Sequence, residues 1–324
     1  MQKLLILFLF ISFLQAAHGQ VIKGSVKDQQ SGNRIPHASV YFSGTFLGVS
    51  ADQNGNFTID ITKYPSRQLT ISAVGYYSSK LSDFSPGEPH IIYLAPKIYE
   101  LDEVVFGDES LSRQKEAYLK LFRKEFLGHT SNARRCEILN EKDITFNYGS
   151  DNDTLKAYAL KPIVIHNRAL GYEINYFLDS FQYCKKRGSL SFTGNIIFKE
   201  DSITLRRFSE RRRRLTYLGS RMHFCRSLWA NDLKSNNFTI WNRAGKNLKY
   251  ESIVIQKDNE EKFLSYTEDI SITRYANWSS IHLLNEQILF DQDGFFDPSG
   301  IRWQGQMAKK RIADWLPYEY EVDR

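Results

Sequence analysis

The stretch Val21-Ile-Lys-Gly-Ser-Val-Lys-Asp28 opens a run of alternating apolar and polar residues that continues to Leu94. Side chains two residues apart share one face of a β-strand, so this alternation predicts strands with one buried face. Short strands at this spacing favour a β-sandwich. Seven strands are predicted: Val21–Asp28, Ser39–Phe42, Gly48–Ala51, Asn56–Ile61, Gln68–Ala73, Tyr76–Leu81 and His90–Leu94.

The turns between these strands support the same fold. Ser31-Gly32-Asn33 and Asp52–Asn56 supply Gly and Asn where a reversing chain needs a positive φ, and Pro36 presets a turn. The alternation also predicts which side chains line the interior: Ile22, Gly24, Val26, Val40, Phe42, Phe57, Ile59, Ile61, Leu69, Ile71 and Ala73.

Four segments carry a resemblance to a known family: Val21–Asp28, Pro36–Phe42, Gly48–Phe57 and Ile71–Tyr76. Their pattern resembles the carboxypeptidase-regulatory-like domain, a transthyretin-like Greek-key sandwich, over about a quarter of the chain. In that family the domain is a noncatalytic accessory of secreted carboxypeptidases and of TonB-dependent outer-membrane receptors. The resemblance therefore implies a fold and a compartment, and it implies no chemistry.

Length and composition suggest two globular domains. The chain has 324 residues, of which 42% are hydrophobic and 25% charged, and a net charge of +6. This charge is mild and favours an anionic partner only weakly, so no nucleic acid is expected. We expect a signal peptide at 1–19, the sandwich at 20–96, an extended linker at 97–109 and an α+β domain at 110–324.

The first residues have the pattern of a secretory signal. Lys3 precedes the apolar run Leu4–Leu14, and Ala17-His18-Gly19 forms a small-residue cleavage site before Gln20. The run is too short to span a bilayer comfortably, and no later stretch of the mature chain is apolar enough for a transmembrane helix. We therefore expect an exported protein that is periplasmic, associated with the outer membrane, or secreted.

The predicted linker contains a segment that could pair, as an extended strand, with a strand of a partner protein. Its residues are Leu101, Asp102, Glu103, Val104 and Val105. They are similar to the segment that joins this sandwich to the plug of TonB-dependent receptors, where an extended strand is offered to a partner by β-augmentation. The alternative is a plain interdomain strand. A receptor itself is excluded, because about 214 residues remain after position 110 and a plug with a 22-stranded barrel needs far more.

The second domain is predicted to combine an antiparallel sheet with two long helices. The first helix opens at Ser110 and ends at Gly128. The second spans 204–234. Strands are predicted at Ile144–Tyr148, Leu155–Leu160, Ile163–His166, Leu170–Leu178, Phe181–Tyr183, Ser189–Phe198, Leu248–Gln256, Phe263–Tyr266, Asp269–Tyr275, Ile281–Phe290 and Gly300–Lys309.

The predicted helix at 204–234 has an apolar stripe and a basic side. The stripe consists of Leu205, Phe208, Leu215, Leu218, Met222, Cys225, Trp229 and Leu233. The opposite faces carry Arg206, Arg207, Arg211, Arg213 and Arg214. We expect these arginines to form a surface for an anionic partner, such as an acidic polymer or lipid headgroups. The alternative is a solvated helix face that pairs with nearby Glu residues.

Segments of the second domain carry a further resemblance. They are Phe126-Leu-Gly128, Ala133–Asn140, Ala169–Tyr172, Tyr217–Phe224 and Leu316-Pro-Tyr318. This combination resembles the second domain of exported Gram-negative envelope proteins that carry the sandwich in front. The role of that family is unassigned, so the resemblance implies no activity.

The sequence contains no strong catalytic or metal-binding motif. Nucleophile elbows, His-Glu-x-x-His helices, phosphate loops and zinc-type Cys pairs are all absent. His223 and Cys225 do not face each other on a helix. The loop from Asp291 to Asp297 lacks the ligands of a calcium loop and is interpreted as an acidic turn. We expect no catalytic residues, no cofactor and no metal.

Two features allow more than one interpretation. The aromatic residues Tyr172, Tyr176, Phe177, Phe181, Tyr183 and Phe192 form either a core or a surface that stacks on sugars. The three cysteines, Cys136, Cys184 and Cys225, are either buried thiols or include one disulfide.

Together these observations predict an exported, noncatalytic envelope protein. It would bind a protein partner or a cell-surface polysaccharide, with peripheral membrane contact possible. The alternative is a secreted hydrolase whose site is assembled in the second domain.

Overall fold

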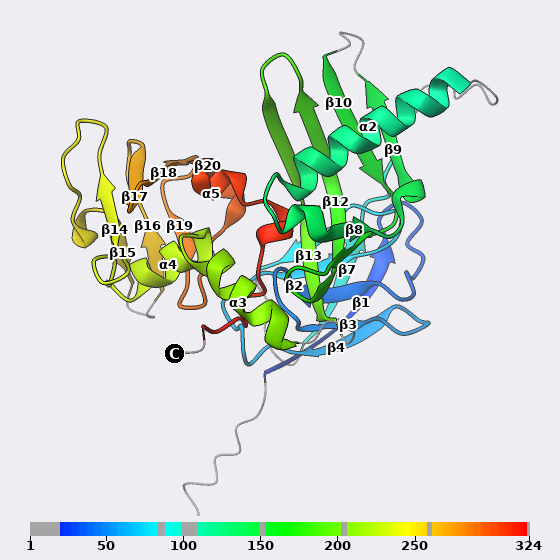
Figure 1. The fold of residues 1–324 in the computed structure, drawn as a ribbon. Helices are drawn as coiled ribbons and strands as arrows, with labels where there is room; N and C mark the ends of the chain where they lie inside the picture. The colour runs from blue at the N-terminus through cyan, green and yellow to red at the C-terminus, as the bar shows by residue number, and fades with distance from the viewer. Residues whose placement is uncertain are drawn as a thin grey trace, which may run out of the picture. The chain divides into compact units, whose positions relative to one another are not determined.

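The structure is a computed structural model that describes residues 20–82, 88–98, 109–148, 153–201, 206–257 and 261–322 (Figure 1). The chain divides into two compact units. Among the described residues, the first unit comprises 20–43 and 47–98, and the second comprises 44–46 and the residues from 109 onward.

The first unit is a β-sandwich of two sheets. One sheet has the order β4-β1-β7 and the other the order β3-β2-β5-β6. β1 and β7 are parallel, and the other pairs are antiparallel. The predicted sandwich is confirmed, with strand ends shifted by at most three residues. The bounds are β1 Val21–Asp28, β2 Ser39–Phe42, β3 Gly48–Ser50, β4 Asn56–Asp60, β5 Leu69–Ser72, β6 Ser79–Leu81 and β7 Pro89–Leu94.

The interior of the sandwich is the one that the alternation predicts. Every predicted apolar side chain is buried in a single cluster, and Gly24 lies in β1 where a Cβ would meet the ring of Phe57 at 2.7 Å. The β3–β4 turn is closed by Asp52, whose Oδ1 accepts the N–H groups of Asn54 and Asn56 at 2.8 Å each. Gly55 supplies the positive φ of +71° that this turn requires.

The first part of the second unit is a six-stranded sheet covered by α2 (Glu109–Leu127) (Figure 1). The sheet has the order β8-β11-β12-β10-β9, and β13 pairs with β12. Two predicted strands form the single strand β12, which continues through a bulge between Leu178 and Ser180. The bounds are β8 Cys136–Ile138, β9 Ile144–Tyr148, β10 Thr154–Ala159, β11 Ile163–Asn167, β12 Tyr172–Cys184 and β13 Ser189–Glu200.

The aromatic residues of β12 and β13 form a core, so the sugar-stacking interpretation of this cluster is wrong. Tyr176 and Phe181 are each 1% exposed. The ring of Phe126, from α2, lies 5.1 Å from that of Tyr176 and 5.5 Å from that of Phe192. Tyr172 and Phe177 are also buried, and Tyr183 packs against the same core. The rings of Phe126, Tyr176, Phe181 and Phe192 pack against one another in the core between the helix and the sheet.

The predicted helix at 204–234 is two helices, α3 (Arg206–Tyr217) and α4 (Arg221–Trp229). Gly219 adopts a φ of +72°, and Ser220 caps α4 by accepting the N–H of His223. Within α3 itself, Leu215 is 62% exposed while Arg213 is 3% exposed, so the buried face of this helix is not the predicted apolar stripe. The prediction was wrong here because the break falls within an otherwise helical pattern.

The remaining part of the second unit contains two smaller sheets that share a core with α4. Their orders are β14-β17-β18-β20 and β15-β16-β19. The predicted strand Ile281–Phe290 is the two strands β18 and β19, and Gly300–Lys309 is β20 followed by a helix. The bounds are β14 Phe238–Trp241, β15 Val254–Gln256, β16 Lys262–Leu264, β17 Ile270–Arg274, β18 Asn277–Leu283, β19 Ile288–Phe290, β20 Ile301–Gly305 and α5 Gln306–Lys309.

Short 3-10 helices complete the second unit, at Ala133–Arg135, Glu141–Asp143, Tyr250–Ser252, Pro298–Gly300 and Ile312–Asp314. None of the helices in the described ranges combines the length and the apolar character needed to cross a bilayer.

Candidate functional site

The turn from Asn167 to Gly171 joins β11 to β12 and organises the candidate site. Asn167 is fully buried, and its Oδ1 accepts the N–H of Leu170 at 3.1 Å while its Nδ2 donates to the carbonyl of Ala313 at 3.1 Å. The N–H of Gly171 donates to the carbonyl of Asn167 at 2.8 Å, with a φ of +68° at Gly171. The buried amide therefore fixes the turn on which Arg168 is carried.

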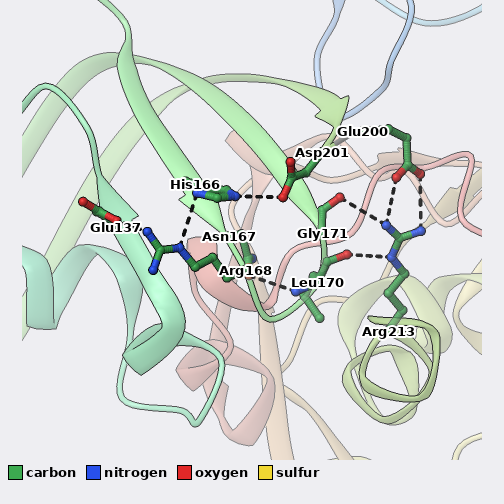
Figure 2. A network of polar contacts seen from close by, with 9 residues as sticks. All are labelled: Glu137, His166, Asn167, Arg168, Leu170, Gly171, Glu200, Asp201 and Arg213. Atoms are coloured by element: carbon green, nitrogen blue, oxygen red, sulfur yellow. Dashed lines mark hydrogen bonds and ion pairs between the residues drawn. The ribbon is translucent and has the colours of Figure 1, made fainter. Parts of the chain in front are cut away.

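Arg213 holds the same turn from α3 (Figure 2). Its Nε donates to the carbonyl of Leu170 at 2.7 Å, and its Nη2 donates to the carbonyl of Gly171 at 3.2 Å and to Glu200 at 2.9 Å. The guanidinium also lies 4.1 Å from the ring centre of Tyr172. All of its contacts are internal, so the prediction that Arg213 belongs to an exposed basic surface is wrong.

On the outer side of the turn, Arg168 and His166 take part in a chain of polar contacts (Figure 2). Nη2 of Arg168 donates to Glu137 at 2.6 Å, and its Nε donates to Nδ1 of His166 at 3.5 Å. Nε2 of His166 lies 2.8 Å from Oδ2 of Asp201. Because Nδ1 accepts, the ring carries its proton on Nε2 and donates it to Asp201. The antiparallel pairing of β8 with β11 places His166 opposite Glu137.

A hollow of about 460 Å³ lies beside this chain of contacts. We call it the arginine hollow, and its lining residues are Arg134, Arg135, Cys136, Glu137 and Arg168. Three positive side chains and one carboxylate give the lining a net charge of +2. Within the described ranges no ion pair involves Arg134 or Arg135, and both side chains are exposed. The arginine hollow therefore presents guanidinium donors to solvent.

The thiol in the hollow belongs to Cys136. Burial raises the pKa of the Cys136 thiol to about 12, with a smaller contribution from Asp314, so the thiol is protonated at neutral pH. Its Sγ donates to the carbonyl of Asn132 at 3.4 Å. Cys136, Cys184 and Cys225 are all free thiols in the structure.

The two sequence features that faintly suggested metal binding have structural explanations. Oδ1 of Asp291 accepts the N–H groups of Asp293 and Phe295 at 2.9 and 3.1 Å, as expected for an acidic turn. Nδ1 of His223 accepts the N–H of Gly219 at 3.0 Å, and its Nε2 lies 3.0 Å from Oδ1 of Asn236. No group of three or more potential metal ligands occurs among the residues that the structure describes.

The buried neutral His223 gives a prediction about acid stability. Burial lowers the pKa of His223 to about 4, below its ordinary value of 6.5. The neutral ring therefore stabilises the fold fully above pH 6.5, and this contribution is lost as the pH falls toward 4, because the unfolded chain binds the proton first. We expect a loss on the order of 3 kcal/mol over that range. Urea unfolding measured from pH 7 to pH 4 should show a shallower decline for His223→Gln than for the wild type. Parallel curves for the two proteins would contradict the assignment.

The predicted basic surface is only partly described. Arg211 and Arg214 are exposed on α3. The side chains of Arg206 and Arg207, and the whole of Leu101, Asp102, Glu103, Val104 and Val105, lie outside the described residues. The sequence reasoning missed Arg134, Arg135 and Arg168 as site residues. Arg168 follows the predicted strand Ile163–His166, but Arg134 and Arg135 precede β8, a strand that the sequence pattern did not predict, so no signal in the sequence joined the two segments.

Comparisons with known proteins give one family match. No curated protein matches the chain. Among solved structures, a putative carbohydrate binding protein from Bacteroides uniformis shares 9% identity with a TM-score of 0.19, covering 88% of this chain and 98% of that one. A putative membrane-associated protein of unknown function from Bacteroides fragilis shares 10% identity with a TM-score of 0.18, covering 88% and 94%. These similarities are too low to transfer a fold or a ligand. Residues 22–106 match the family model of the CarboxypepD_reg-like domain, and the N-terminal sandwich of this chain is such a domain.

Proposed function

We propose that the protein is an exported, noncatalytic binding protein of the cell envelope, and that the arginine hollow binds an acidic group of a cell-surface polymer. Export rests on the signal pattern of residues 1–19, which lie outside the described residues. The noncatalytic role is supported by the accessory type of the N-terminal domain, by the protonated Cys136 and by the engagement of both ring nitrogens of His166.

The observation that carries the proposal is the presence of three arginines around one hollow with a single carboxylate among them. A guanidinium group presents a planar set of donors that matches the two oxygens of a carboxylate, sulfate or phosphate. The contact of Arg168 with Glu137 is exposed, so it contributes little stability and a ligand oxygen can replace it at small cost. Arg134 and Arg135 remain available for the same ligand.

The experiment compares two double variants in a polymer-binding assay. Residues 20–324 are titrated with a polyuronate, a sulfated polysaccharide and a teichoic-acid-type polyphosphate, with uncharged dextran as the control. We expect Arg134→Gln/Arg135→Gln to weaken binding at least about tenfold at low salt, and added salt to weaken wild-type binding. The matched control is Arg211→Gln/Arg214→Gln, which removes the same charge from exposed positions of α3 and should change affinity by less than about threefold.

Three results would contradict the proposal. The first is that the wild type binds none of the acidic polymers, and the second is that Arg134→Gln/Arg135→Gln binds as tightly as the wild type. The third is that only the α3 variant Arg211→Gln/Arg214→Gln loses binding, which would favour the basic surface of α3 as the binding site. A hydrolytic activity that is lost on mutation of His166 or Asp201 would support the secreted-hydrolase alternative.

A further inference from the structure

The face of the sheet β14-β17-β18-β20 that points away from its core carries polar and aromatic side chains. Alternate residues of these strands point inward and are buried, among them Ile240, Ile272 and Ile281. The intervening residues point to the opposite face because side chains alternate along a strand. The outward residues are Thr239, Trp241, Ser271, Thr273, Trp278, Ser280, His282, Arg302 and Gln304.

Strand pairing arranges these side chains in rows. Thr239, Thr273 and Trp278 are partners in the first row. The second row consists of Trp241, Ser271, Ser280 and Gln304. His282 and Arg302 form the third row, and Nδ1 of His282 lies 2.7 Å from Oδ1 of Asp269. Hydroxyl and amide groups therefore lie in the same rows as the two indoles.

The two indoles stand on either side of Thr273. Trp278 is its direct partner on β18 and is 48% exposed. Trp241 is half-buried on β14, and its Nε1 donates to Oγ1 of Thr273 at 3.3 Å, which fixes the orientation of the ring. Oγ1 of Thr273 is also 3.5 Å from the carbonyl of Thr239. On this face the indole of Trp241 is therefore held by a hydrogen bond to Thr273, while the neighbouring indole of Trp278 is exposed to solvent.

The side chains of this face indicate which class of ligand it can bind. None of the outward positions carries an aliphatic side chain, although the core of a protein interface is usually apolar. The negative charge of Asp269 offsets the positive charge of Arg302, so this face does not attract a strongly anionic polymer. A neutral sugar presents an apolar ring face that packs on an indole, and hydroxyl groups that bond to Ser, Thr and Gln side chains. The complementary ligand is therefore an uncharged saccharide.

We propose that this face binds a neutral oligosaccharide, with Trp278 and Trp241 stacking on its rings and Ser271, Thr273 and Gln304 bonding to its hydroxyl groups. This inference goes beyond the proposed function, because it uses a different surface and an uncharged ligand. It does not depend on the arginine hollow.

The test is a calorimetric titration of residues 20–324 with neutral hexasaccharides. The five hexasaccharides are those of glucose, mannose, xylose, galactose and N-acetylglucosamine. We expect at least one of them to bind, Trp278→Ala to weaken that binding at least about tenfold, and Trp278→Phe to retain affinity within about threefold. Tyr275→Ala is the matched control, because Tyr275 is an aromatic residue that is 69% exposed and lies in the turn between β17 and β18. It should bind as the wild type does, with all variants showing the wild-type circular dichroism spectrum.

Absence of binding for all five sugars, or wild-type affinity in Trp278→Ala, would overturn the inference. So would loss of sugar binding in Arg134→Gln/Arg135→Gln with retention in Trp278→Ala, since that pattern would place the sugar in the arginine hollow. Retained sugar binding by the arginine variant, together with its loss of acidic-polymer binding, is the result expected if both sites exist.

Discussion

Replacement of Arg213 with Met is expected to lower the free energy of unfolding of the second unit by about 3 kcal/mol. The substitution removes the donor to the buried carbonyl of Leu170, the ion pair with Glu200 and the contact with the ring of Tyr172. It also removes one of two donors to the carbonyl of Gly171, which still accepts the N–H of Asp201 at 3.1 Å. A buried carbonyl that loses its partner keeps its desolvation cost, because Met offers no donor. Arg213→Lys should lose about half as much, since a single ammonium cannot reproduce the planar set of donors.

Tryptophan fluorescence measures this effect selectively, because all five Trp residues lie after position 200, in the second unit. Urea unfolding of the wild type, Arg213→Met and Arg214→Met should show the loss in the first variant only. Arg214 is the matched control, being the next residue on the same helix and exposed, so its change should stay within about 0.5 kcal/mol. Equal effects at the two positions would show that Arg213 does not hold the turn.

The second large effect is expected for Phe126→Ala, at about 4 kcal/mol. Phe126 is fully buried between α2 and the sheet, and its ring lies 4.8 Å from that of Phe122 and 5.1 Å from that of Tyr176. Truncation removes the burial of the ring and leaves a cavity that the surrounding rings fill only in part.

Unfolding by urea measures this change as well, with Leu160→Ala as its control. Leu160 is 49% exposed, so its loss should cost less than about 0.5 kcal/mol. If Phe126→Ala unfolded like the wild type, the aromatic residues of β12 and β13 would not form the tightly packed core that the structure shows.

The sandwich could be predicted almost strand by strand because its signals are local. Alternation over a few residues defines each strand, and Asp52 and Gly55 define a turn within five residues. The second unit was harder. A bulge at Leu178 leaves β12 continuous where the sequence pattern is interrupted. The stretch from Ile281 to Phe290 conceals a break between β18 and β19, which belong to different sheets.

The roles of Arg213 and Arg214 could not be separated from the sequence. Both lie in the same run of arginines, and only the packing of α3 against a turn more than 40 residues earlier decides which of them is buried. The same limit applies to the arginine hollow. Arg134 and Arg168 come from segments that meet only through the pairing of β8 with β11, and a single sequence carries no direct record of that register.

Arginine-specific modification with phenylglyoxal, read by mass spectrometry, tests the central claim most directly. The wild-type protein is modified with and without the acidic polymer that binds most tightly. We expect the polymer to protect Arg134 and Arg135 at least about fivefold, while Arg211 and Arg214, which are also exposed, react at unchanged rates. Protection of Arg211 and Arg214 with unchanged rates at Arg134 and Arg135 would contradict the assignment of the arginine hollow as the binding site.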